Sequence, residues 1–236
     1  MRINIDRSLQ LRTGLAISLF WLVFAGVLSV GEAATFDGEK AYDYLKKQCE
    51  FGPRVPGTGA HEKAGAYLEK ELKKYANKVE KQTFTKELGG KAVRLTNYIA
   101  TFEYVCPLEQ VAKGEGACKP PTWALVGAHW DSRPTADKEK DPAKRKQAIL
   151  GANDGASGTA VVLELARQLQ KEVRVNGVKL VLFDGEDYGP GGDNMYLGSK
   201  YFAEHYKGPE LEWAVVVDMV CLLYTSPSPR DRTRSR

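Results

Sequence analysis

The stretch Leu180-Val181-Leu182-Phe183-Asp184-Gly185-Glu186-Asp187-Tyr188-Gly189 decides the fold of this chain. Its first four residues are continuously apolar, as in a parallel strand that is covered on both faces of a sheet. Three carboxylates, Asp184, Glu186 and Asp187, follow within four positions. In sheets of parallel strands, ligands and catalytic groups lie just beyond the carboxyl ends of the strands. Adjacent acids repel one another unless a cation neutralises them, so the stretch predicts either a cation site or a solvated acidic turn.

Alternating strand and helix patterns fill the rest of the chain. A weakly alternating stretch at 79–85 and stretches rich in β-branched and aromatic residues at 93–104, 123–128 and 213–217 predict strands. Helices are predicted at 37–50, 59–77 and 198–206, with Thr58 as the cap of the second, and after Gly158, where apolar residues between 162 and 169 form one face. This order of elements is typical of a layered α/β fold. We therefore expect a mixed, largely parallel central sheet with helices on both faces.

Residues of the kind that bind metals follow several of the predicted strands. They are His129 with Asp131, then Asp154, then Glu186 with Asp187, and then Asp218. Because strand ends in one sheet converge in space, this pattern favours a metal site over an acidic turn. His129 and Asp131 are two positions apart and point to the same side of a strand, so Asp131 is expected to orient the His129 ring. The alternative for His129 is a packed structural residue.

Asp154 lies in the turn Gly151-Ala152-Asn153-Asp154-Gly155-Ala156-Ser157-Gly158, which precedes a predicted helix. Small residues let the backbone approach an ion closely, which suits Asp154 as a ligand. The alternative is that Asp154 or Asn153 caps the helix without any metal. The polar segment 132–147 is long enough to be a surface loop that borders the site.

The first 33 residues have the three parts of a secretory signal. Arg2, Arg7 and Arg12 precede an apolar run from Leu15 to Val30, and small residues follow. The run is shorter than the roughly 20 residues of a membrane-spanning helix. We expect residues 1–33 to be a signal peptide, cleaved near Ala33, and an uncleaved membrane anchor is the alternative.

The cysteines and the charges are informative mainly through their positions. A disulfide between Cys106 and Cys118 is consistent with export, although two free thiols fit as well, and Cys49 and Cys221 have no evident partner. The formal net charge of +4 comes from arginines near the two ends of the chain, which leaves residues 34–220 neutral. No basic stripe indicates a nucleic-acid partner.

Together these motifs resemble the zinc-dependent M28 peptidase clan. The resemblance runs from about Phe51 to Val220, and the motifs that carry it are His129-Trp130-Asp131-Ser132-Arg133-Pro134, Gly151 to Gly158, Phe183 to Gly189 and Asp218-Met219. Within that clan, the segment Phe51 to Thr58, the Trp-Asp-Ser-Arg-Pro run and Leu197-Gly198-Ser199 are more similar to bacterial glutaminyl cyclases than to typical aminopeptidases. The resemblance implies a zinc exopeptidase-like (phosphorylase/hydrolase-like) fold for residues 34–220.

The resemblance also implies a role for each candidate residue. Asp154 and Asp187 would be zinc ligands, and Glu186 would be the general acid/base. Asp218 would bind a second metal in dizinc peptidases or hydrogen-bond near the substrate in cyclases. His129 would be a second-metal ligand in the peptidases and a non-ligand in the single-zinc cyclases. Many relatives have Glu at the position of Asp187, so this shorter acid is a departure from the commoner pattern, although not from that of bacterial cyclases.

A second departure concerns the end of the chain. The resemblance implies a further zinc-binding histidine well beyond Asp218, and none is present there. Residues 221–236 lack apolar periodicity and core residues, which predicts a disordered, non-native tail after an incomplete domain. A natural basic tail is the alternative. With two zinc ligands rather than three, we expect a poor or inactive enzyme with loose zinc binding and exposed apolar surface. We expect His61 to face solvent and His205 to interact with the carboxyl end of its helix.

Three functions follow from these expectations. The first is a zinc-dependent glutaminyl-peptide cyclotransferase with one zinc ion, which converts an N-terminal Gln to pyroglutamate and releases ammonia. The second is an M28 aminopeptidase with two zinc ions. The third is an inactive peptidase-like binding module, although retention of Glu186, Asp187, Asp154 and Asp218 argues against it. The expected partners are peptide or protein N-termini, and the expected location is secreted or periplasmic, without stable membrane insertion after signal cleavage.

Overall fold

The computed structural model describes residues 35–105, 122–172, 174–189 and 191–220. The chain divides after Ala34 into two units, and only the second, Thr35–Arg236, contains described residues. The predicted signal peptide, the Cys106 to Cys118 loop and the segment 221–236 with Cys221 lie outside the described residues.

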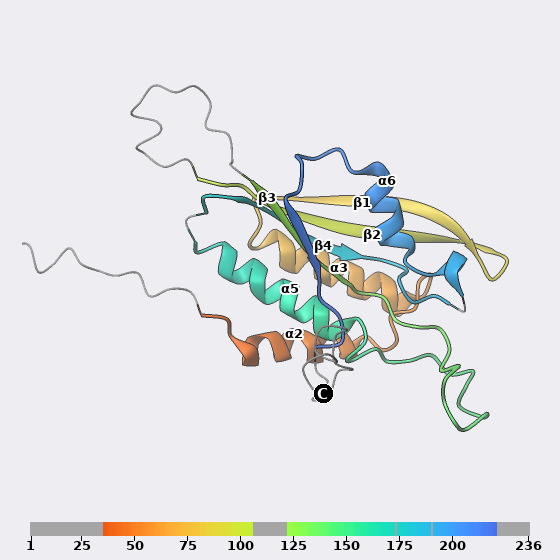
Figure 1. Ribbon diagram of the computed structural model, residues 1–236. Helices are drawn as coiled ribbons and strands as arrows, with labels where there is room; N and C mark the ends of the chain where they lie inside the picture. Colours follow the sequence, from red (N-terminus) through yellow and green to blue (C-terminus); the bar gives the residue numbers. More distant parts are fainter. Residues whose placement is uncertain (1–34, 106–121, 173, 190, 221–236) are drawn as a thin grey trace, which may run out of the picture. The chain divides into compact units, whose positions relative to one another are not determined.

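A mixed five-stranded sheet forms the centre of this unit, in the order β1-β2-β4-β3-β5 (Figure 1). The strands are β1 (Lys78–Leu88), β2 (Lys91–Phe102), β3 (Trp123–His129), β4 (Gly177–Phe183) and β5 (Trp213–Val216). Strand β3 pairs in parallel with both β4 and β5, whereas β2 pairs antiparallel with β1 and β4. The predicted mixed sheet is confirmed, and its parallel part consists of β3, β4 and β5.

Helices cover both faces of the sheet, as predicted. They are α2 (Gly38–Glu50), α3 (Gly59–Lys73), α5 (Ala156–Leu169) and α6 (Leu197–His205), with a 3₁₀ turn, η1 (Gly192–Asn194). Helices α3 and α5 lie on one face with α2 beside α5, and α6 lies on the other face (Figure 1). The predicted cap of α3 is confirmed, because Thr58 Oγ1 accepts the His61 N–H at 3.3 Å.

The alternating side chains of β4 fill two separate cores. Leu180 and Leu182 pack in the cluster that includes Leu68 of α3 and Leu163 of α5. Val181 and Phe183 pack on the opposite face with Phe202 of α6. Successive residues of a strand point to opposite faces, so a strand covered on both sides must be apolar at every position. This explains the continuous run that predicted a buried strand.

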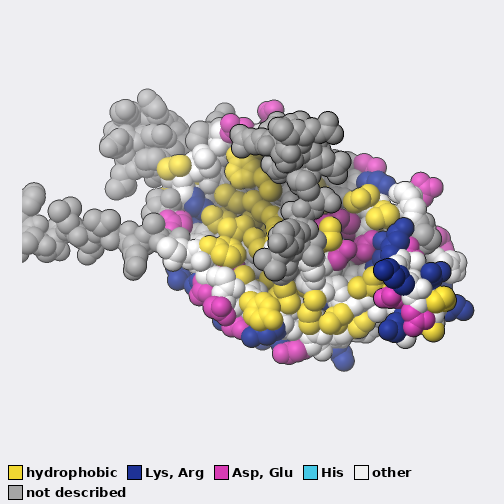
Figure 2. All heavy atoms as spheres, turned by 60° about the horizontal axis from the view of Figure 1, so that its bottom comes forward, with side chains coloured by type: hydrophobic (Ala, Val, Ile, Leu, Met, Phe, Trp, Pro, Cys, Tyr) yellow, Lys and Arg dark blue, Asp and Glu magenta, His cyan; other side chains and the backbone are white. Residues whose placement is uncertain are grey.

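Strand β5 is less covered than β4. Of the described strands it pairs with β3 alone, and Trp213, Val215 and Val216 are 50%, 47% and 56% exposed. Figure 2 shows hydrophobic side chains gathered on one face of the molecule. The exposed apolar surface expected from the sequence is therefore present. Among the described residues, no helix is long and apolar enough to cross a membrane.

Candidate metal centre

Three strand ends and one helix start bring the candidate residues together. His129 is the last residue of β3, the acidic segment Asp184–Asp187 follows β4 directly, and Asp218 lies two residues beyond β5. Asp154 precedes helix α5 by two positions. Since β3, β4 and β5 are parallel neighbours, their carboxyl ends meet at one edge of the sheet. The predicted convergence of these residues is therefore present in the fold.

His129, Asp154 and Asp218 form the group best suited to hold a metal ion among the described residues, since their ligand atoms lie within 4.8 Å of one another. His129 Nε2 lies 2.9 Å from Asp154 Oδ1 and 3.5 Å from Asp218 Oδ1. Despite these short distances, this buried nitrogen makes no aligned hydrogen bond to a described residue. A buried imidazole nitrogen without a hydrogen bond, flanked by two carboxylates, suits a shared cation, so this group fits a zinc ion.

Electrostatic contacts within the group shift the pKa values of His129 and Asp218. Burial opposes the charged form of His129, but contacts with the carboxylates of Asp131, Asp154 and Asp218 outweigh it and raise the pKa of His129 well above its usual value. The contact with His129 lowers the pKa of Asp218. The negative charges of the carboxylates therefore surround one imidazole ring. A bound cation would neutralise these charges.

Asp154 is available to this group because it does not cap helix α5. The cap position is occupied by Gly155, which has a φ of +93° and makes no side-chain capping bond. A Cβ at Gly155 would lie 2.6 Å from the Asp131 carbonyl oxygen and 3.0 Å from the His129 ring. Glycine is needed there both for its positive φ and for the close approach. The alternative in which Asp154 is simply the helix cap is therefore wrong.

A second close approach positions Asp218. A Cβ at Gly158 in the first turn of α5 would lie 2.2 Å from the carbonyl oxygen of Val217. The Val217 N–H donates to the Gly127 carbonyl at 2.8 Å, and the Val220 N–H donates to Ser157 Oγ at 3.1 Å. These contacts hold the segment after β5 against α5, which brings Asp218 beside His129.

Asp131 connects the ends of β3 and β4. It is fully buried, and its carboxylate accepts the backbone N–H groups of Glu186 at 3.0 Å and Asp187 at 3.2 Å. Its Oδ1 also lies 3.4 Å from His129 Nδ1. Burial opposes ionisation, but the contact with His129 and the two N–H donors outweigh it and lower the pKa of Asp131. Asp131 thus orients the His129 ring and also fixes the backbone that carries Glu186.

Glu186 lies at this centre and is half-buried. Its carboxylate accepts no hydrogen bond from the described part of the chain, and burial raises its pKa to about 7, assisted by the negative charges of Asp131, Asp218 and Asp154. A carboxyl group with these properties suits proton transfer near neutral pH.

Asp187 has a different partner from the other candidate ligands. Its Oδ1 accepts a hydrogen bond from Arg133 Nη1 at 2.6 Å, and Arg133 Nε in turn lies 2.7 Å from Asp137 Oδ1. Arg133 and Asp137 belong to the loop that was predicted to border the site. Asp187 is buried and is not part of the His129–Asp154–Asp218 group. The Arg133 contact is a feature that spacing along the sequence did not suggest.

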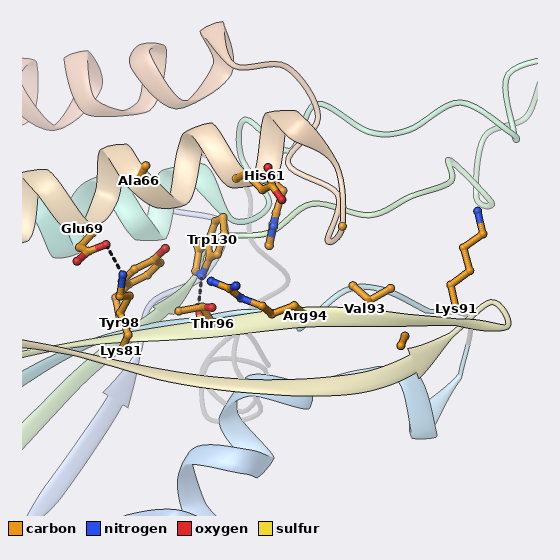
Figure 3. Close-up of a pocket in the computed structure, with 13 residues that line it drawn as sticks. His61, Ala66, Glu69, Lys81, Lys91, Val93, Arg94, Thr96, Tyr98 and Trp130 are labelled. Atoms are coloured by element: carbon orange, nitrogen blue, oxygen red, sulfur yellow. Dashed lines mark hydrogen bonds and ion pairs between the residues drawn. The ribbon is translucent and has the colours of Figure 1, made fainter.

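His61 is buried, so the expectation that it faces solvent is wrong. Its Nε2 lies 2.8 Å from Asp184 Oδ1, and its ring stacks on Trp130 with centroids 4.2 Å apart. Figure 3 shows His61 and Trp130 between helix α3 and strand β2, where they line a cavity of about 500 Å³. His61 lies three positions before Ala64 and seven before Leu68, so the apolar stripe of the helix contained the signal for its burial.

The Asp184 carboxylate is fully occupied by partners. Besides His61, it accepts the Thr96 N–H at Oδ2, at 2.6 Å, while the Asp184 N–H donates to Asn97 Oδ1 at 3.0 Å. Burial raises the pKa of Asp184 to about 6. Asp184 therefore anchors the start of the acidic segment to β2 and faces away from the His129 group.

Arg54 is another functional-site neighbour that sequence reasoning missed. It is fully buried, and it donates to the carbonyl oxygens of Trp130 at 2.9 Å, Leu150 at 2.9 Å and Gly151 at 2.8 Å. These bonds join the end of β3 to the turn that carries Asp154.

His205 lies where expected, with its Nδ1 2.9 Å from the Tyr201 carbonyl oxygen in the last turn of α6.

Comparison with known proteins identifies a family. Residues 111–227 match the model of peptidase family M28. The chain is 32% identical over 105 residues to aminopeptidase YwaD of Bacillus subtilis, a match that covers 43% of this chain and 19% of that protein.

Solved structures give broader matches. A Zn-dependent exopeptidase from Parabacteroides distasonis superposes with a TM-score of 0.70 and 33% identity, covering 80% of this chain and 63% of that one. The glutaminyl cyclase of Tannerella forsythia superposes with a TM-score of 0.69 and 35% identity, covering 79% and 63%. The chain thus spans less than two thirds of the length of these relatives. Their likeness confirms the zinc exopeptidase-like fold that the sequence motifs implied.

Proposed function

Because the chain carries a peptidase family M28 domain, we propose that it is a zinc-dependent glutaminyl-peptide cyclotransferase that acts on peptide N-termini. The observation that carries the proposal is the position of Glu186. Its half-buried carboxylate lies in the field of Asp131, Asp154 and Asp218 and accepts no hydrogen bond from the described residues. The similarity to a glutaminyl cyclase at 35% identity supports the choice of reaction.

In this mechanism, a zinc ion held at the centre would supply Lewis-acid polarisation of the side-chain amide carbonyl of an N-terminal glutamine. His129, Asp154, Asp218 and Asp187 are the side chains available to hold it. Glu186 accepts a proton from the α-amine as the amine nitrogen forms a bond to the amide carbon. Glu186 then donates that proton to the departing amide nitrogen as the carbon–nitrogen bond breaks, so that ammonia leaves and pyroglutamate forms.

A second candidate function is an aminopeptidase with two zinc ions. The convergence of His129 with Asp154 and Asp218 favours it. Together with Asp187, these residues would provide enough ligands for a second zinc ion. Here Glu186 would accept a proton from the water molecule that attacks the first peptide bond, and would donate it to the new amino terminus. Both reactions use the same acid/base residue and the same strand ends.

Substrate and metal measurements on the 236-residue protein distinguish the two. At saturating zinc we expect one loosely bound ion per chain, slow ammonia release from a peptide with N-terminal Gln, and no release of Leu from a peptide with N-terminal Leu. Two bound zinc ions with Leu release would overturn the cyclase proposal in favour of the aminopeptidase. Absence of turnover on both substrates with zinc bound would favour the inactive binding module.

Zinc titration tests the number of ligands separately. If Asp154 and Asp187 are the two protein ligands, zinc binds loosely, because a catalytic zinc usually has three protein ligands. If His129 also binds the ion, zinc binds tightly and the affinity depends on this residue. The dissociation constant, measured by competition with a chelating dye, decides between these ligand sets.

We also propose that residues 1–33 direct export. Expression of the full chain in a bacterial host, followed by fractionation and determination of the mature N-terminus, tests this. A mature protein that begins near Ala34 outside the cytoplasm supports the proposal, and retention of Met1 in the membrane fraction would instead indicate an uncleaved anchor.

A further inference from the structure

A lysine is buried in the sheet at a distance from the candidate metal centre. Lys179 of β4 is only 7% exposed, and its Nζ lies 3.1 Å from Thr101 Oγ1 and 5.3 Å from the centroid of the Trp123 ring. No ion pair between described residues includes Lys179. Burying an ammonium group is costly unless an opposite charge lies against it. Among the described residues, the Lys179 ammonium contacts a hydroxyl group and a ring face, while the Glu80 carboxylate acts on it without forming an ion pair.

Lys179 forms part of the wall of a cavity of about 420 Å³ between the start of β1 and the end of α6. Three more lysines line it, Lys78, Lys81 and Lys207, and Glu80 is the acidic residue among the lining side chains. Glu80 already pairs with Lys78 at 2.9 Å, and Lys81 pairs with Glu69 outside the cavity at 3.0 Å. Lys179 and Lys207 therefore remain as cations without an ion-pair partner in the described part of the chain. Burial lowers the pKa of Lys179 and outweighs the opposing effect of the Glu80 carboxylate.

The same cavity has an apolar side. Ile99 of β2 and Phe202 and Tyr206 of α6 line it, and Phe202 is 6% exposed. The volume falls within the range of roughly 300–1,000 Å³ that is usual for small-molecule sites. A cavity with buried positive charge at one side and aromatic rings at the other suits a ligand that has an anionic head and an apolar body.

The cavity is separate from the metal centre. Lys179 precedes Phe183, the last residue of β4, by four positions, which is about 13 Å along a strand. The residues that line the cavity include none of the candidate metal ligands. A ligand bound there would thus occupy a second site rather than the proposed active site.

We propose that this cavity binds a small organic phosphate. The phosphate group lies against the ammonium groups of Lys179 and Lys207, since lysine binds phosphate as a compact point charge. The apolar part of the ligand packs on Phe202 and Tyr206. The phosphate supplies an ion-pair partner for Lys179, which forms none with the described residues.

Binding of phenyl phosphate to the full 236-residue protein, measured by calorimetry at constant ionic strength, tests the proposal. We expect saturable binding that is tighter than that of inorganic phosphate, because the ring adds an apolar contact. Lys179→Met should weaken binding of phenyl phosphate about tenfold or more, as expected for loss of a buried hydrogen-bonded charge. Lys207→Met, at an exposed position, should weaken it by up to about fivefold.

Lys171→Met is the matched control, since Lys171 is exposed at the end of α5 and does not line the cavity. It should bind phenyl phosphate as the wild type does. If Lys179→Met does not fold, Lys207→Met still tests the site because its side chain is exposed. The proposal is overturned if phenyl phosphate does not bind, or if Lys207→Met and every folded Lys179 variant bind it as tightly as Lys171→Met does. Equal affinity for phenyl phosphate and inorganic phosphate would overturn the assignment of the apolar contact.

Discussion

Two buried histidines of this protein contact carboxylates, and the two arrangements differ. His61 is 5% exposed and contacts one carboxylate, that of Asp184, which is also bound by the Thr96 N–H. His129 is 1% exposed and lies within 3.5 Å of the carboxylates of Asp131, Asp154 and Asp218. The His61 ring has one carboxylate partner, to which it is hydrogen-bonded. The His129 ring has three carboxylates near it, and its Nε2 forms no aligned hydrogen bond to the two on that side.

The exposure of the partners explains the difference. The Asp184 side chain is fully buried, whereas those of Asp154 and Asp218 are 45% and 35% exposed. Partly exposed carboxylates can face an ion that enters from solvent, and His129 Nε2 makes no aligned hydrogen bond that would compete with it. A histidine that is hydrogen-bonded to one carboxylate, itself bound by other groups, has a structural role. A histidine with several carboxylates near a nitrogen that forms no aligned hydrogen bond indicates a metal site.

The largest effect is expected at Glu186, on the His129 side. Glu186→Gln should lower turnover about 10²–10⁴-fold, because the amide keeps the shape of the side chain but cannot transfer a proton. Zinc affinity should not change, since Glu186 is not among the proposed ligands. Steady-state kinetics and a zinc titration measure the two effects. Glu204→Gln, an exposed position on α6, is the control. Near-normal turnover in Glu186→Gln would remove Glu186 from the mechanism.

The two histidines themselves give the most direct test of the comparison. His129→Ala should weaken zinc binding at least about 10–100-fold, the range seen when groups around a metal are removed. His61→Ala should leave zinc affinity unchanged while it lowers the free energy of unfolding, because Asp184 then loses a buried partner. If the two variants bind zinc with equal affinity, His129 does not contribute to the metal site and has a structural role, as His61 does.

A smaller effect, on stability and its pH dependence, is expected on the His61 side. Asp184→Asn should lower the free energy of unfolding by about 1–3 kcal/mol. Because the pKa of Asp184 is raised from 3.8 to about 6, the carboxyl group stabilises the fold most below pH 3.8 and loses that contribution as the pH rises through 6. The stability difference between wild type and Asp184→Asn should therefore be largest near pH 4. Denaturant unfolding at several pH values measures it. The exposed Asp43→Asn is the control, because the contact with Lys46 lowers the pKa of Asp43 and predicts a trend of the opposite sign.

The smallest effect is expected at the edge of the metal centre. Asp137 pairs with Arg133, which contacts Asp187, and the Asp137 side chain is 33% exposed. Asp137→Asn should change zinc affinity by less than about fivefold, since exposed ion pairs contribute about 0–1 kcal/mol. A zinc titration of this variant checks the prediction. A larger loss would show that Arg133 and Asp137 hold Asp187 in place for the metal.

The sequence predicted the elements of the fold because their signals are local. The apolar run of β4, the helical stripe of α3 and the Thr58 cap each depend on residues within about one or two turns or strand steps of one another. Once the strands are assigned, their converging ends predict which side chains meet at one edge of the sheet. These are His129, Asp154, Glu186, Asp187 and Asp218. The individual roles of these residues stay predictions, which the variants above address.

Some contacts were not predictable because they join residues that are far apart in the chain. Arg133 meets Asp187, and His61 meets Asp184, only because helix α3 and the loop after β3 pack around the end of β4. Arg54 is a further case, since a buried guanidinium group needs several carbonyl oxygens that only the folded chain brings together.

The sequence by itself determined the strands, the helices and the set of acidic residues at the strand ends, because periodicity and capping act over a few residues. Only the tertiary structure decided which carboxylates reach His129. That choice depends on two close approaches, of Gly155 to the end of β3 and of Gly158 to Val217. Each requires a position without a Cβ, and each is made by packing between segments that are distant in the sequence. Asp154 and Asp218 therefore face one imidazole, while Asp184 faces another.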